Sequence, residues 1–388
     1  MKKRRMSGKW FGMGMIVVTM ILFGSLHSSY AAEPIPLCSM SDFSSVGAVF
    51  GIQEVPVIEM VVKEVNAAGG INGRPIKLTI QDAASDPSKA IGIARMFKEQ
   101  YKCKVIIGPV ISSVGLALKA WGEKNQISVM AIDPATDRIW DKSGKSWIFR
   151  TEVPGQIRLI AGLARMKKLG YTKVAFEGST LAWGTDSLNV LKEKAPEYGM
   201  TVVGAVQVEP KTKDLTIQAK QLMDTGAQAV ICADYEAEAG VFARAMKSIG
   251  WKPYVFHVSS ATYTNTLATN PPELFEGWET SMTIDATKPI IKEIWNKTSA
   301  FTGKAMIQDE KAPRVWDAIN LLLAAMKAGG NPDDSVAIRD GYYKLKNYER
   351  AIGKKGSKGG YVEGKNHLLD IDDLVPYTTV AGKLVPAK

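Results

Sequence analysis

The residues best suited to binding a ligand are two hydroxyls in the sequence Gly108-Pro-Val-Ile-Ser-Ser, which follows an apolar run and opens a predicted helix. Backbone N–H groups at a helix N-terminus lack partners within the helix, and together with hydroxyls they attract anions. Ser112 and Ser113 therefore predict a carboxylate-binding site. The same serines also fit an ordinary helix N-cap, and the two interpretations are compatible.

Residue types for catalysis or metal binding are sparse. The histidines and cysteines lie scattered along the chain, at His27, His257, His367, Cys38, Cys103 and Cys232. This scatter does not fit a zinc site, a His-based triad or a disulfide framework. The chain also lacks a Gly-x-Ser-x-Gly elbow, a phosphate-binding loop and a His-Glu-x-x-His motif. We expect no enzymatic activity, no cofactor and no metal. One bridge between Cys38 and Cys103 stays open beside the alternative of buried free thiols.

The first residues predict export. Five basic residues between Lys2 and Lys9 precede an apolar stretch over residues 10–26, and Ser29-Tyr30-Ala31 then offers small residues for cleavage. This pattern is typical of a signal peptide over residues 1–31, and the alternative, a retained anchor, would be short for a membrane span. Its removal takes away five positive charges and no acids, so the net charge falls from +10 to about +5. We therefore expect a periplasmic protein, without a later membrane span, that binds no nucleic acid.

Apolar runs alternate with amphipathic helical stretches in two series, which predicts an α/β fold with two doubly wound parallel-sheet lobes. The expected N-terminal lobe comprises residues 32–150 plus 281–348, and the C-terminal lobe residues 151–280 plus 349–388. Three connections, near residues 149–154, 277–283 and 346–359, would form the hinge. Because ligands bind outside the carboxyl ends of parallel strands, the strand-to-helix loops of both lobes should line one cleft.

One long segment carries a family resemblance. It begins with Glu64-Val-Asn-Ala-Ala-Gly-Gly-Ile-Asn-Gly-Arg-Pro-Ile-Lys-Leu and continues to Asp82-Ala-Ala-Ser-Asp-Pro. It resembles the periplasmic type I solute-binding proteins of the leucine/isoleucine/valine ABC-transporter family. The resemblance implies a monomeric venus flytrap that captures a small apolar carboxylate of the branched-chain amino acid class and passes it to an ABC permease in the inner membrane. A carboxylate without an α-amino group, or service to a sensor or chemoreceptor, stays open.

The resemblance also implies roles for the loop residues. Ser112, with Ser113 beside it, and Thr136 match the hydroxyl residues that hold the ligand carboxylate. Pro134 replaces an alanine whose carbonyl accepts from the ligand ammonium. Three aromatic residues match the pocket walls, although each fits a core position as well: Phe50, Trp183 and Tyr235.

One position departs from the family pattern. Where amino-acid binders of this family carry a glutamate for the ligand ammonium, this chain has Ser260. A buried ammonium without a carboxylate partner is costly. Either another acid substitutes or the ligand lacks an ammonium group. The candidate acids are Asp133, Glu152, Asp234 and Glu236.

Overall fold

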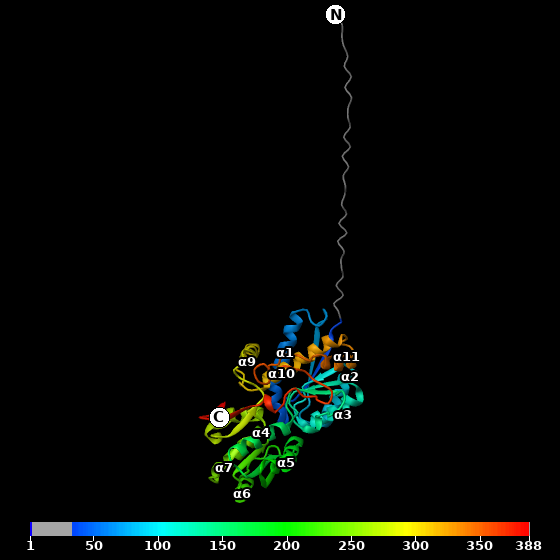
Figure 1. Ribbon diagram of the computed structural model, residues 1–388. Helices are drawn as coiled ribbons and strands as arrows, with labels where there is room; N and C mark the ends of the chain where they lie inside the picture. The colour runs from blue at the N-terminus through cyan, green and yellow to red at the C-terminus, as the bar shows by residue number, and fades with distance from the viewer. Residues whose placement is uncertain (2–32, 388) are drawn as a thin grey trace. The chain divides into compact units, whose positions relative to one another are not determined.

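The computed structural model describes residue 1 and residues 33–387, so the expected signal peptide, apart from its first residue, lies outside the described residues. From Glu33 onward the chain forms one compact unit, in which strands and helices alternate and the strands form two sheets (Figure 1). The α/β fold with two doubly wound lobes is thereby confirmed.

The first sheet has five parallel strands in the order β2-β1-β3-β4-β5. They are β1 (Ile35–Ser41), β2 (Ile76–Asp82), β3 (Val105–Ile107), β4 (Ser128–Ala131) and β5 (Ile148–Arg150). Every residue of β3, β4 and β5 is buried, as expected for parallel strands covered by helices on both faces.

The second sheet has seven strands in the order β12-β11-β10-β9-β8-β6-β7. They are β6 (Lys173–Ser179), β7 (Thr201–Val208), β8 (Ala229–Ala233), β9 (Tyr254–His257), β10 (Glu279–Met282), β11 (Val375–Val380) and β12 (Lys383–Pro386). The strands from β6 to β10 are parallel, whereas β11 and β12 add an antiparallel edge.

The helices connect and cover these strands. They are α1 (Ala48–Ala67), α2 (Pro87–Glu99), α3 (Ser112–Asn125), α4 (Gly155–Lys168), α5 (Ala182–Lys194), α6 (Thr216–Asp224), α7 (Glu236–Ser248), α8 (Ser260–Thr269), α9 (Pro289–Thr302), α10 (Lys311–Gly329) and α11 (Ser335–Lys344). Short 3-10 helices lie at Ser45–Gly47, Asp137–Ile139, Ala195–Tyr198, Pro272–Phe275 and Ile371–Asp373. The stretch Ser45–Ala67 is long and apolar enough to cross a membrane by length and composition, but over half of it is buried within this fold.

The C-terminal segment differs from the sequence-based division. Residues 349–369 were expected in the second lobe, yet Tyr361 donates to the Arg150 carbonyl at 3.1 Å and His367 pairs with Arg150 beside β5. A buried carboxylate, Asp317 of α10, accepts from the N–H groups of Ala351 and Ile352. The third connection between the sheets therefore comes after Leu369, and the other boundaries stay predictions.

A disulfide joins Cys38 of β1 to Cys103, which lies two positions before β3, with Cα atoms 6.0 Å apart. The two strands are neighbours in the first sheet, which brings the half-cystines together although 65 positions separate them. The pairing that the sequence left open is therefore present, and Cys232 is a buried free thiol.

Candidate binding cleft

A cavity lies at the carboxyl ends of both sheets' strands. First-lobe residues such as Ser112 and Asp133 line it together with second-lobe residues such as Trp183 and Val258. The strand-end rule therefore selected the correct loops in both lobes.

Three aromatic side chains, Phe50, Trp183 and Tyr235, form much of the apolar wall, and each is at most 6% exposed. The Trp183 and Tyr235 rings pack edge to face with centroids 5.6 Å apart. Burial raises the pKa of the Tyr235 hydroxyl, so it stays protonated at neutral pH. The three residues that the sequence placed on the pocket wall do line the cavity, and their role as ligand contacts stays a prediction.

The glycines after two of these aromatics explain how the rings reach the cavity. A Cβ atom on Gly51 would lie 1.9 Å from the carbonyl oxygen of Asp42, and one on Gly184 would lie 2.1 Å from that of Ser179. Only glycine lets α1 and α5 approach the end of the preceding strand so closely. Both Phe50 and Gly51 lie in the first turn of α1, which begins at Ala48.

Ser112 and Ser113, the two serines expected at the carboxylate site, differ in their position relative to the cavity. Ser112 is the first residue of α3 and lines the cavity, and its hydroxyl accepts from the Thr136 N–H at 3.2 Å. The helix N-cap is Ile111, which makes no side-chain cap, so Ser112 is not the ordinary N-cap that the sequence also allowed. Ser113 is not among the residues that line the cavity.

Thr136 and Pro134 both face neighbours within the protein. The Thr136 hydroxyl donates to the carboxylate of Asp186, which comes from α5 of the other lobe. The Pro134 carbonyl, expected to face a ligand ammonium, lies 3.4 Å from a guanidinium nitrogen of Arg150. Ala135, between them, is the residue of this turn that lines the cavity.

Ser260 is buried at the start of α8, and its hydroxyl accepts from Arg158 Nη1 at 3.0 Å. The position where the family pattern has a glutamate therefore holds a hydroxyl bonded to a cation. An ammonium group would meet no acid there.

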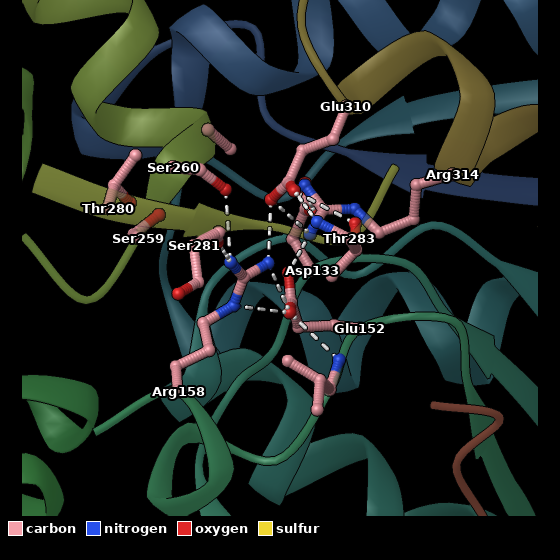
Figure 2. A network of polar contacts seen from close by, with 12 residues as sticks. Asp133, Glu152, Arg158, Ser259, Ser260, Thr280, Ser281, Thr283, Glu310 and Arg314 are labelled. Carbon is pink, nitrogen blue, oxygen red and sulfur yellow. Dashed lines mark hydrogen bonds and ion pairs between the residues drawn. The ribbon is translucent and has the colours of Figure 1, made fainter. Parts of the chain in front are cut away.

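Arg158 belongs to a buried network of charges at the cavity (Figure 2). Its Nε and Nη2 donate to Glu152 at 3.0 and 2.8 Å, and Nη2 also donates to Glu310 at 2.6 Å. Nη1 donates to Ser260 and to the Ser281 carbonyl. All five N–H groups of this guanidinium thus have acceptors, which come from both lobes and the connections between them.

Arg314 of α10 is the second buried cation at the cavity. It is fully buried, its Nη2 lies 2.6 Å from Asp133 Oδ1, and its Nη1 contacts Glu152 and lies 3.4 Å from Glu310. Glu310 is held further by the N–H and hydroxyl of Thr283, at 2.6 and 2.8 Å. Figure 2 shows Arg158 and Arg314 approaching this group of carboxylates from opposite sides.

Of the four acids proposed from the sequence, Asp133 and Glu152 line the cavity. The other two lie outside the lining: Asp234 pairs with His257 at 2.8 Å, and Glu236 accepts from Asn265 at 3.3 Å. Burial raises the pKa of Glu236 to about 7. Among the described residues, no three or more His, Cys, Asp or Glu side chains are placed so that they could hold a metal ion.

The family model for periplasmic binding proteins matches residues 34–367. The chain belongs to this family. The family is one of solute-binding proteins and implies a location outside the cytoplasm, in the periplasm or beyond it.

Relatives and solved structures agree with this assignment. This periplasmic binding protein is 26% identical over 311 residues to Leu/Ile/Val-binding protein homolog 3 of Brucella melitensis, covering 79% of this chain and 82% of that protein. The branched-chain amino acid substrate-binding protein LivJ of Streptococcus pneumoniae, in complex with isoleucine, has a TM-score of 0.77 at 17% identity over 90% of this chain and 97% of that one. A Rhodopseudomonas palustris solute-binding protein in complex with benzoate has a TM-score of 0.75 at 18% identity over 91% and 95%. The two solved structures share the fold.

Sequence reasoning missed both cavity arginines of this periplasmic binding protein, together with Glu310. A signal was present for one pair, because Glu310 and Arg314 stand four positions apart at the start of a largely apolar helix. Charged residues on the buried face of such a helix need oppositely charged partners. Where those partners lie at the end of a strand, they indicate a ligand-binding site. The partners of Arg158 lie up to 152 positions away and left no local pattern.

Proposed function

We propose that this protein is the substrate-binding component of an ABC importer, and that it captures a small carboxylate ligand with an apolar body by closing its two lobes. The observation that supports the proposal best is the cavity between the sheets, which combines three aromatic side chains with buried charged groups. An apolar cavity with a few convergent polar groups is the usual form of a small-molecule site. The relatives named for leucine, isoleucine and valine, and the solved complexes with isoleucine and benzoate, are consistent with it.

Lobe closure is supported by polar contacts that join the two lobes. Gln53 of α1 donates to Asn265 of α8 at 3.2 Å, and Lys311 of α10 donates to the Ala261 carbonyl at 3.1 Å. Closure of hinged domains around a ligand is established for periplasmic binding proteins as a class. A ligand that contacts both walls favours the closed form because it binds that form more tightly.

A thermal-shift screen tests the proposal. The panel contains branched-chain and aromatic amino acids, aliphatic and aromatic acids, sugars and polyamines, since a ligand raises Tm according to its concentration relative to Kd. We expect at least one carboxylate to raise Tm. A shift only with sugars or polyamines would contradict the proposal. Uptake of the binding carboxylate should be lost in cells without this protein, and unchanged uptake would argue against service to an importer.

Ser112 and Ser113 offer a matched pair of variants. Ser112→Ala removes a hydroxyl that lines the cavity and should weaken carboxylate binding about tenfold, the value of a hydrogen bond to a charged group. Ser113→Ala, one residue further along α3 and outside the lining, should leave Kd unchanged. Isothermal titration gives both values. Equal Kd values for the two variants would remove the ligand carboxylate from the start of α3.

A further inference from the structure

The Asp133–Arg314 pair at the cavity is close but incompletely bonded. Arg314 is 0% exposed and Asp133 is 9% exposed, with Nη2 and Oδ1 2.6 Å apart. Beyond this ion pair and a side-chain hydrogen bond between Asp133 and Glu54, the Asp133 oxygens and Nε and Nη2 of Arg314 make no directed hydrogen bond to a described residue. Buried polar groups without hydrogen bonds are rare and costly, so both residues have bonding capacity left for a ligand.

The other acids of the network have little capacity left. Glu152 Oε1 accepts from Arg158 twice and from the Val153 N–H at 2.8 Å, and its second oxygen contacts Arg314. Glu310 is held between Arg158 and Thr283. Asp133 is therefore the cavity carboxylate that can accept from a ligand without breaking an existing hydrogen bond.

The charges of the network favour a ligand that carries its own cation. Three carboxylates, Asp133, Glu152 and Glu310, face two guanidinium groups, so these side chains carry one net negative charge. A ligand with only a carboxylate would add a second uncompensated charge to a buried site. A zwitterion adds none and can place its cation beside Asp133.

Glu54 of α1 neighbours Asp133 and is buried, and its carboxyl group shares a side-chain hydrogen bond with Asp133. Burial and the neighbouring Asp133 carboxylate raise the pKa of Glu54 well above its usual range. A neutral Glu54 leaves the net charge of the network unchanged.

We propose that Asp133, held in place by Arg314, is the ammonium-binding carboxylate of this cleft, and that the ligand is an α-amino acid with an apolar side chain. This inference rests on the proposed function. It moves the ammonium site from the start of α8, where Ser260 bonds Arg158, to the loop after β4 in the first lobe. The ligand carboxylate then lies toward Ser112 and the N-terminus of α3, and its side chain toward Phe50, Trp183 and Tyr235.

The test uses matched ligands that differ only in the amino group. L-leucine is compared with 4-methylpentanoate, and L-phenylalanine with 3-phenylpropanoate, by thermal shift and isothermal titration on the mature protein. We expect an amino acid to bind and its deaminated partner to bind at least about 30-fold more weakly. Asp133→Asn should weaken binding of the amino acid by a similar factor and reduce the discrimination within each pair. Glu236→Gln, which removes a nearby acid outside the cavity lining, should leave both unchanged.

Each other outcome is decisive. If a deaminated acid binds as tightly as its amino acid, or if Asp133→Asn keeps the wild-type Kd and selectivity, the ammonium site is refuted while the carboxylate cleft stands. If sugars or polyamines bind and no carboxylate does, the proposed function fails together with it. If Asp133→Asn does not fold, as judged by circular dichroism, the paired ligands on the wild-type protein still decide.

Discussion

The two arginines at the cavity are alike in residue type, burial and acidic neighbours, yet their bonding differs. Arg158 uses all five N–H groups on acceptors from both lobes and their connections. Arg314 has two nitrogens, Nε and Nη2, without a hydrogen bond to any described residue. Burial and charge therefore do not distinguish these two arginines. The number of guanidinium N–H groups that have a hydrogen-bond acceptor does distinguish them.

The largest test of this difference replaces each arginine by methionine. Arg158→Met leaves Glu152 and Glu310 facing one remaining cation and removes bonds between the lobes, so we expect a loss of about 3–5 kcal/mol in the free energy of unfolding. Arg314→Met leaves the bonds of Arg158 intact and removes the cation of Asp133, whose carboxylate lines the cavity, so it should cost less, about 1–3 kcal/mol. Urea unfolding without ligand measures both.

Arg95→Met is the control for these variants, because Arg95 is an exposed residue of α2 and its replacement should change stability by less than about 0.5 kcal/mol. If Arg314→Met lowered the free energy of unfolding as much as Arg158→Met, the number of hydrogen-bonded N–H groups would not distinguish a stabilising arginine from one available to a ligand. Both cations would then serve stability.

A second test concerns a buried acid that is held by backbone N–H groups, in contrast to the cavity acids, which are held by arginines. Asp317 of α10 is 1% exposed and accepts from Ala351 and Ile352. Burial raises its pKa to about 6. The folded protein therefore binds this proton more tightly than the unfolded chain, and the stability that this provides is present at low pH and is lost as pH rises from about 4 through 6.

We expect this group to lower the free energy of unfolding by about 2 kcal/mol between pH 4.5 and 7.5. Asp317→Asn cannot titrate, so its destabilisation relative to wild type should be about 2 kcal/mol smaller at pH 7.5 than at pH 4.5. Urea unfolding at both pH values measures this difference. An unchanged difference would mean that Asp317 is ionised across the whole range.

The sequence could predict what depends on local pattern. Alternating apolar runs predicted both sheets, and the rule for strand ends selected the loops. The family resemblance then pointed to Ser112, Trp183 and Tyr235 within them, and all three line the cavity. These features depend on residues a few positions apart and on general rules for parallel sheets.

The rest of the cleft depends on pairings between distant segments. Arg158 meets Glu310 across 152 positions, and neither residue signals its partner. Residues 349–388 were expected in the C-terminal lobe, whereas Tyr361 is buried against the first lobe. Thr136 was expected to face the ligand, but its hydroxyl bonds Asp186 of the opposite lobe. Contacts of this kind are fixed by the packed structure and not by the local sequence.

The smallest expected effect concerns Asp186, which reaches from α5 to the first lobe. Its carboxylate accepts from the Thr136 hydroxyl and pairs with Arg138 at 3.1 Å. Because the Arg138 side chain is 57% exposed, this ion pair should contribute only about 0.5–1 kcal/mol to the closed form. Asp186→Asn should therefore weaken ligand binding about three- to fivefold, mainly through faster dissociation. Glu193→Gln removes an exposed acid from the same helix without a cross-lobe contact and is the control. Stopped-flow tryptophan fluorescence gives both dissociation rates. If the two variants dissociate at the same rate, Asp186 does not hold the lobes closed, and that role falls to Arg158 and its partners.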